Sequence, residues 1–248
     1  MTQSSYSVLF QRLLRQTLAI VVVAAIALSG CSPASEGETV GEGAGNPDLP
    51  RLDGSAVVEL AIKGETVTVN VTGEYAPITA GNFVDLVDKG VYDGVAFHRV
   101  VKQPEPFVVQ AGDPQSKDPN FPQERLGTGS YIDPATGAPR YIPLEITPEG
   151  ADEPVYSQPF SAAGITESPR LPHSRGAVAM ARSTFPDSAS AQFYITLSEL
   201  RFLNGEYAVF GSVEADDMAI VDQIEQGDRI ESARVLSGLD NLQRGDAS

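Results

Sequence analysis

The stretch Phe97-His98-Arg99-Val100-Val101 is followed, after a short gap, by Pro106-Phe107-Val108-Val109-Gln110-Ala111-Gly112-Asp113-Pro114. Both runs are rich in Val and Phe, which favour strands, and the Gly and Pro that close the second run are typical of a turn. We therefore expect two neighbouring extended segments. They set one arginine, one glutamine and an aromatic residue into an apolar background, so this stretch bears on both fold and chemistry.

Further short strands are expected on both sides of this stretch. Thr66-Val67-Thr68-Val69-Asn70-Val71 alternates polar and apolar residues, the period of a half-buried strand. The other expected strands cover 56–62, 97–101, 107–111, 176–181, 192–197 and 208–213, with 235–236 closing the sheet. Helices are expected over 78–89, with Thr79 as N-cap, and over 216–226. Many short strands with two helices predict an all-β barrel or sandwich.

Composition limits the partners. The chain has 248 residues, 42% of them apolar, enough for one sizeable core. Its formal net charge is −16, which argues against nucleic acid as a partner because phosphate binding needs clusters of Lys and Arg. The acidic charge is interpreted as a means of solubility, with an acidic docking face as the alternative. We expect a monomer.

The N-terminus has the pattern of a targeting segment. Arg12 and Arg15 precede an apolar run over 18–28, which is short of the ~20 residues that span a bilayer. The run ends in Leu28-Ser29-Gly30-Cys31, which resembles a bacterial lipobox, and Cys31 is the only cysteine of the chain. We interpret 1–30 as a lipoprotein signal peptide and Cys31 as a lipidated residue. The alternative is an uncleaved transmembrane anchor.

The rest of the chain divides by composition. Residues 31–50 are rich in Gly, Glu, Ser and Pro and are interpreted as a flexible tether. The folded domain is expected over 51–240 with a C-terminal tail over 241–248, and a long insertion rich in Pro and Gly interrupts it around 115–172. We expect that insertion to be an ordered surface excursion, in preference to a separate module. The predicted location is the cell envelope, on a membrane and facing the periplasm or the exterior.

Two later stretches complete a family pattern. They are Met180-Ala181-Arg182 running to Ala191-Gln192-Phe193-Tyr194-Ile195, and Arg201-Phe202-Leu203-Asn204-Gly205-Glu206-Tyr207-Ala208-Val209-Phe210-Gly211. Together with the first stretch they resemble the cyclophilin family of peptidyl-prolyl cis/trans isomerases, from about Val57 to about Leu236. The resemblance implies an eight-stranded closed antiparallel barrel with one helix at each open end.

The implied reaction needs few chemical groups. Rotation about the bond before proline has a barrier of about 18–20 kcal/mol because resonance gives the C–N bond double-bond character. A catalyst must favour the twisted state, through a donor aimed at the proline nitrogen, an apolar pocket for the ring and polar groups for the backbone. We therefore expect no cofactor and no metal site, and proline-containing polypeptides as partners.

The resemblance assigns a role to each matching residue. Arg99 stands at the position of the catalytic arginine, and Gln110 at that of a glutamine that bonds the substrate backbone and steadies the arginine. The residues at substrate-binding positions are Phe107, Val108, Ala181, Arg182, Gln192, Tyr194, Phe202, Leu203 and Tyr207. His98 is expected to be structural because the reaction moves no proton, and His173 gives no catalytic signal.

The chain departs from the family pattern in places. Arg182 replaces an asparagine found in many eukaryotic members, and Phe202 stands where cyclosporin-sensitive members carry a tryptophan. The connection over 100–106 is longer than expected, and its turn either bulges outward or leans inward, where Lys102 or Glu105 would crowd the site. The resulting hypotheses are an envelope-anchored isomerase that assists the folding of extracytoplasmic proteins, a binding module or chaperone with little turnover, and a structural lipoprotein that has lost the site.

Overall fold

The computed structural model describes residues 48–245. The predicted signal peptide, Cys31 and most of the predicted tether lie outside these residues. Within them, no helix has both the length and the apolar character needed to cross a membrane.

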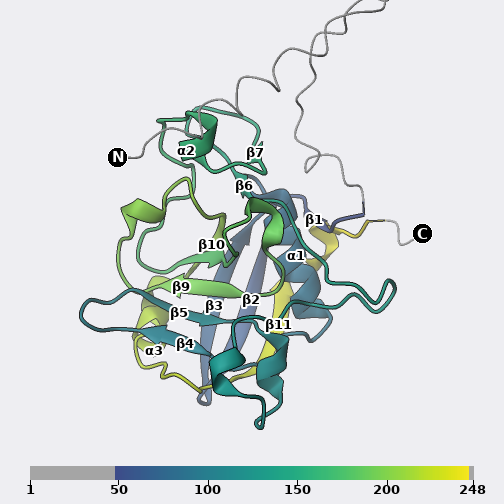
Figure 1. Ribbon diagram of the computed structural model, residues 1–248, viewed down its shortest axis with the longest axis vertical. Coiled ribbons are helices and arrows are strands. Elements are labelled where there is room, and N and C mark those ends of the chain that lie inside the picture. Colours follow the sequence, from purple (N-terminus) through teal and green to yellow (C-terminus); the bar gives the residue numbers. More distant parts are fainter. Residues whose placement is uncertain (1–47, 246–248) are drawn as a thin grey trace, which may run out of the picture. The chain divides into compact units, whose positions relative to one another are not determined.

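Most strands of the described region belong to one sheet. Their bounds are β2 (Ser55–Ile62), β3 (Glu65–Thr72), β4 (Arg99–Val101), β5 (Val108–Ala111), β8 (Ala177–Met180), β9 (Phe193–Thr196), β10 (Val209–Val213) and β11 (Ile230–Ser237). These eight strands pair antiparallel in the order β11-β2-β3-β10-β8-β9-β5-β4 (Figure 1). The expected eight-stranded antiparallel sheet is therefore confirmed.

The two edges of this sheet meet only over a short distance. The sheet curls, and Ala96, just before β4, forms an isolated bridge with Arg229, just before β11. The backbone N–H of Phe97 donates to the Asp228 carbonyl at 2.8 Å, and the Phe97 carbonyl accepts from Gly227 at 3.0 Å. The expected antiparallel barrel is thus a curled sheet whose two edges are joined by hydrogen bonds between residues 94–97 and 227–230, without a ladder between β4 and β11.

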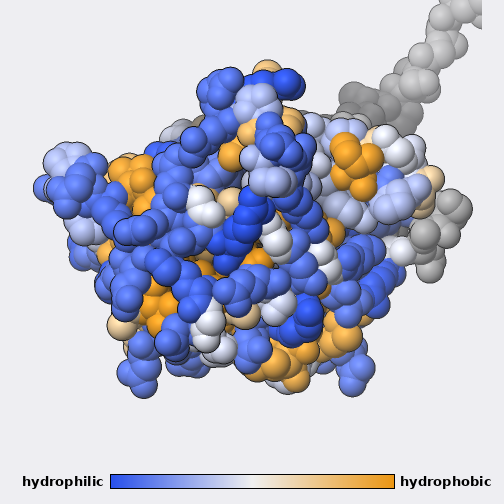
Figure 2. Space-filling view, turned by 90° about the horizontal axis from the view of Figure 1, so that it is seen from below, coloured by the Kyte–Doolittle hydropathy of each residue, from blue (hydrophilic) through white to orange (hydrophobic). Residues whose placement is uncertain are grey.

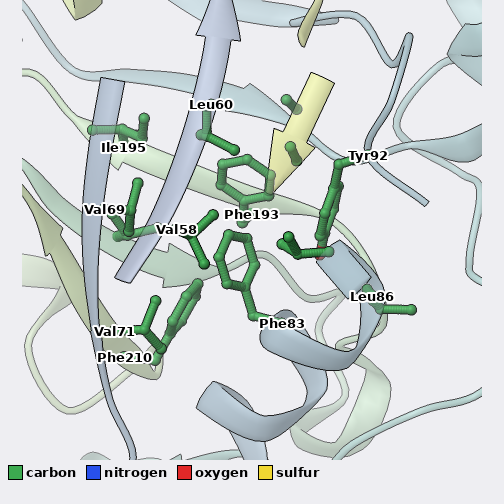
Figure 3. Close-up of a cluster of buried hydrophobic side chains, with 14 of the residues drawn as sticks. Val58, Leu60, Val69, Val71, Phe83, Leu86, Tyr92, Phe193, Ile195 and Phe210 are labelled. Carbon is green, nitrogen blue, oxygen red and sulfur yellow. The ribbon is translucent and has the colours of Figure 1, made fainter. Parts of the chain in front are cut away.

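Alternating side chains of the sheet form the core. In β2 every second residue is buried, so Val58 and Leu60 face inward, as the strand period requires. The centre holds the aromatic rings of Phe83, Tyr92, Phe193 and Phe210 (Figure 3). The Phe83 ring centre lies between 4.9 and 5.3 Å from the other three, so its helix is held against the sheet.

That helix, α1 (Pro77–Asp88), begins close to the predicted position but is capped differently. Thr79 is not its N-cap. Instead the buried carboxylate of Glu145 accepts hydrogen bonds from the backbone N–H groups of Ile78 at 3.2 Å and Thr79 at 2.8 Å. A residue of the insertion therefore supplies the acceptor that a helix N-terminus needs.

The second predicted helix is much shorter than expected. A 3₁₀ turn over Ala215–Asp217 leads into α3 (Met218–Val221), and the helix ends there rather than at 226. Met218, Val221 and Ile224 are nevertheless all buried in the core. The apolar spacing thus predicted burial correctly and helix length wrongly.

The insertion packs onto the barrel. It contains β6 (Glu145–Ile146), β7 (Val155–Tyr156) and α2 (Phe160–Ala163), which lie together in Figure 1. Leu144, Ile146 and Phe160 form a small buried cluster with Ala208, next to β10. Two further insertion residues, Tyr131 and Ile142, belong to the main core. The insertion is therefore ordered, and it contributes side chains to the main core in addition to covering the surface.

The C-terminal boundary also differs from the prediction. Leu242–Gln243 forms β12, which pairs antiparallel with β1 (Arg51–Leu52). Arg244 then bonds the buried Asp85 of α1 at 3.0 Å and Asp88 at 2.5 Å. Residues 242–244 thus belong to the fold, although we expected them in the tail.

On the face seen in Figure 2, hydrophilic residues dominate and apolar ones form separated groups.

Candidate active site

A cavity of about 280 Å³, here called the main cavity, opens where β4, β5 and β9 lie side by side. Its lining contains nine of the eleven predicted catalytic and substrate-binding residues. They are Arg99, Phe107, Val108, Gln110, Ala181, Arg182, Tyr194, Leu203 and Tyr207. The sheet register explains the convergence: Arg99 lies opposite Gln110, and Gln110 lies opposite Tyr194. Directly opposed residues of antiparallel strands point to the same face.

The apolar part of the main cavity is separate from the main core. Val108 and Tyr194 form a second buried cluster, against which Phe107, Leu203 and Tyr207 pack while remaining partly exposed. Tyr207 lies edge-on to Tyr194, with ring centres 6.0 Å apart. These side chains therefore leave an open apolar depression.

Arg99 projects over the edge of this depression. Its guanidinium carbon lies 5.4 Å from the centre of the Phe107 ring. Its Nη1 donates to Gln110 Oε1 at 3.5 Å, at the long end for a hydrogen bond. Gln110 Nε2 in turn donates to Gln192 Oε1 at 3.2 Å. This chain orients Gln110 with its oxygen toward the arginine.

Gln192 lies in a neighbouring cavity of about 370 Å³ rather than in the main one. Its Nε2 donates to the carbonyl of Gly129 at 2.8 Å. The two cavities share Gln110, Ala181 and Arg182 in their linings. Gln192 therefore acts on the main cavity through Gln110.

Arg182 forms the wall between the two cavities. Its Nε and Nη2 donate to the Glu206 carbonyl at 3.1 and 2.7 Å, and its Nη1 donates to the Ser183 carbonyl at 2.9 Å. Its guanidinium carbon lies 4.7 Å from the centre of the Tyr207 ring. Arg182 therefore braces Tyr207.

Phe202 is the second predicted residue outside the main cavity lining. Its side chain is 69% exposed and stacks on Phe107, with ring centres 6.0 Å apart and an interplanar angle of 12°. Its neighbour Leu203 is the residue of this turn that lines the cavity. Phe202 thus extends the apolar rim.

The long turn between β4 and β5 points away from Arg99. Residues 103–105 are exposed, and Lys102 Nζ donates to the carbonyl of Asp222, just after α3, at 2.6 Å. Neither Lys102 nor Glu105 lines the main cavity. Of the two arrangements considered, the outward one is observed.

The sequence analysis missed two residues that support the site. Asp113 is buried, and its carboxylate accepts from the backbone N–H groups of Gly127 at 2.6 Å and Gly129 at 3.2 Å. It thereby holds the segment that anchors Gln192. His173 is buried beside Tyr194, with Nε2 2.9 Å from the phenolic oxygen. The Gly-Asp-Pro turn was a local signal for a role of Asp113, whereas nothing in the sequence indicated the contact between His173 and Tyr194.

The other histidine is not part of either cavity lining. His98 is buried next to Gly127, and burial lowers the pKa of its imidazole. Among residues 48–245 no group of three or more His, Cys, Asp or Glu side chains could hold a metal ion.

Comparison with known proteins shows the family. The family model "cyclophilin type peptidyl-prolyl cis-trans isomerase/CLD" matches residues 57–242. This chain belongs to the cyclophilin family. A probable peptidyl-prolyl cis-trans isomerase of Brucella abortus is 33% identical over 185 residues, covering 74% of this chain and 78% of that protein.

Two longer peptidyl-prolyl cis-trans isomerases are more similar in sequence. A putative thylakoid lumen peptidyl-prolyl cis-trans isomerase of Synechocystis is 39% identical over 210 residues, covering 81% of this chain and 52% of that protein. The chloroplastic peptidyl-prolyl cis-trans isomerase CYP38 of Arabidopsis thaliana is 36% identical over 213 residues, covering 79% of this chain and 45% of that protein. The matched segments thus span about half the length of these two isomerases.

A solved cyclophilin shares the fold. The crystal structure of a cyclophilin-type isomerase of Cryptosporidium parvum aligns with a TM-score of 0.53 at 23% identity, covering 74% of this chain and 98% of that one. At this identity the likeness concerns the fold alone.

Proposed function

We propose that this protein is a peptidyl-prolyl cis/trans isomerase that acts through the main cavity. The observation that carries the proposal is the placement of the Arg99 guanidinium over the edge of an apolar depression, beside the oriented amide of Gln110. A proline ring is apolar and fits such a depression. The nitrogen that becomes basic when the bond twists then faces a donor that stays protonated.

In this mechanism each group has a distinct task. Phe107, Val108, Tyr194 and Leu203 hold the proline ring. Arg99 donates to the pyramidal nitrogen of the twisted state, and that interaction is weaker in the planar ground states, so it lowers the barrier. The polar groups around Ala181 hold the substrate backbone. The backbone N–H of Ala181 donates to the Gln192 carbonyl at 2.9 Å, so the carbonyl of Ala181 is the group that we expect to face the substrate.

The N-terminal sequence supports a proposal for the place of action. We propose that Cys31 is lipidated and anchors the domain to a membrane of the cell envelope, where it acts on exposed X-Pro bonds of extracytoplasmic proteins. The apolar run before Cys31 and its lipobox-like end support this. The Synechocystis isomerase is named for the thylakoid lumen, which is also outside the cytoplasm.

Turnover and binding need to be measured together to test the activity. Exchange spectroscopy by NMR follows both isomers of an Ala-Pro peptide without a coupled protease, and the same titration gives the peptide affinity. We expect exchange to be accelerated at catalytic protein concentration. Affinity without acceleration would contradict the isomerase and favour the binding module.

The anchoring is tested separately in cells. In this account the wild-type protein begins at Cys31 and carries fatty acid on it, which mass spectrometry of the N-terminal peptide detects. Replacement Cys31→Ser removes the sulfur that carries the lipid and should abolish the acylated peptide. A wild-type protein that keeps residues 1–30 and carries no fatty acid would contradict lipidation and favour the transmembrane anchor.

A further inference from the structure

A buried histidine lies directly behind the main cavity. His173 is 1% exposed and Tyr194 is 5% exposed. His173 Nε2 lies 2.9 Å from the hydroxyl oxygen of Tyr194, the aromatic residue at the base of the cavity. His173 itself is not in the cavity lining, so it can act on a substrate only through the side chains that it holds.

The hydrogen bonds around His173 determine its tautomer. The backbone N–H of His173 donates to Asn204 Oδ1 at 2.8 Å, which fixes the orientation of the Asn204 amide. The same oxygen lies 3.2 Å from His173 Nδ1. An oxygen cannot donate there, so Nδ1 carries the proton and Nε2 carries the lone pair. The Tyr194 hydroxyl must therefore donate to Nε2, and it points away from the cavity.

His173 also holds the turn that carries Leu203. Asn204 directly follows Leu203, which lines the main cavity. The carbonyl of His173 accepts from the backbone N–H of Leu200 at 2.8 Å, at the other end of the same turn. One residue thus connects β9, through Tyr194, with both ends of the turn that carries Leu203.

We propose that His173 is a positioning residue that sets the width of the main cavity. It holds the Tyr194 ring and the Leu203 turn at a fixed separation and keeps a hydroxyl group out of the surface that meets the proline ring. This inference rests on the proposed function, but it concerns how the cavity holds the proline ring and not how Arg99 donates. Without the imidazole, the buried Tyr194 hydroxyl has to find another partner, and the ring can tilt.

Three variants isolate the contact. His173→Ala removes both side-chain hydrogen bonds, Tyr194→Phe removes only the hydroxyl, and His173→Gln offers an amide oxygen to the hydroxyl. We expect His173→Ala to lower kcat/KM about tenfold, the effect expected when a buried hydrogen bond is lost. The loss should lie in KM and peptide affinity, because the grip on proline acts in ground and transition states alike. His173→Gln should recover a large part of it.

Coupling shows whether the two residues act as one unit. The double variant His173→Ala/Tyr194→Phe should lose about as much kcat/KM as His173→Ala alone, because both changes remove the same bond. The matched control is Val58→Ala, a buried β2 residue of the main core, which should lower the unfolding midpoint and leave peptide affinity unchanged. Equal affinity in His173→Ala and wild type, or fully additive losses, would overturn the proposal.

A spectroscopic readout is independent of turnover. In a ¹⁵N-histidine spectrum of the wild-type protein, His173 should show a protonated Nδ1 and an unprotonated Nε2, and Tyr194→Phe should shift the Nε2 signal. A protonated Nε2 would overturn the proposal. If the wild type binds proline peptides without turnover, the isomerase proposal fails, and the affinities and the tautomer still decide the role of His173.

Discussion

The guanidinium carbon of Arg99 lies 5.4 Å from the centre of the Phe107 ring. The charged donor and an apolar wall of the main cavity are therefore in contact, although residues 100–106 separate them in the chain. A cation above an aromatic face is attracted to it by about 0.5–1 kcal/mol at exposed sites. Phe107 thus both lines the cavity and steadies the donor.

Replacement Phe107→Ala should consequently impair both functions. It removes apolar surface from the cavity and the ring beneath the guanidinium, so we expect kcat/KM to fall by about tenfold to a hundredfold. Phe107→Leu keeps the apolar volume and should lose less. The control Leu236→Ala changes an exposed apolar residue of β11, and its kcat/KM should equal that of wild type. Equal losses in Phe107→Leu and Phe107→Ala would contradict the role of the ring under Arg99.

Glu145 gives the domain a pH-dependent stability. Burial raises the pKa of its carboxyl above the ordinary value of 4.5, so the folded state binds the proton more tightly than the unfolded state. Stability from this group is therefore present at low pH and is lost as pH rises from 4.5 through the raised folded pKa.

Urea unfolding at several pH values measures this dependence. Glu145→Gln keeps an acceptor for the α1 N-terminus and cannot ionise. It should therefore be less destabilising, relative to wild type, at pH 7 than at pH 4.5. If the destabilisation of Glu145→Gln relative to wild type grows with pH, the ionised carboxylate is the preferred cap and the prediction is contradicted.

His173 should give a dependence of the opposite sign. Burial lowers the pKa of its imidazole from 6.5 to about 4, so the unfolded state binds the proton more tightly. Stability is then fully present above pH 6.5 and is lost as pH falls toward 4, by about 3 kcal/mol over that window. His173→Gln removes this contribution, so its stability relative to wild type should improve as the pH falls. If the difference in unfolding free energy between His173→Gln and wild type is the same at pH 7 and at pH 4.5, the imidazole of His173 is not buried in its neutral form and the prediction is contradicted.

The contacts within the sheet could be predicted from sequence because strand patterns are local. The Val- and Phe-rich runs around Arg99 and Gln110 define two antiparallel strands. Once these are paired, the two polar side chains necessarily fall on one face. The resemblance to cyclophilins then assigned the other residues, and nine of the eleven predicted ones line the main cavity.

Contacts between distant segments could not be predicted in this way. Glu145 caps α1 from 66 and 67 residues away, and the local N-cap candidate Thr79 lies inside the helix. His173 meets Tyr194 because a loop folds behind the sheet, and no periodicity describes that path. Such side chains follow from tertiary packing, which overrides local propensity.

The most direct test of the account is the exchange rate of an Ala-Pro peptide with wild type, Arg99→Ala and the control Arg234→Ala. Arg234 is an exposed β11 residue paired with Asp93 and lies outside the main cavity. The account predicts that Arg99→Ala lowers kcat/KM by about a hundredfold or more, as for the loss of a donor to a transition state, with an unchanged fold and unchanged rates in Arg234→Ala. Full turnover in a folded Arg99→Ala protein would contradict it.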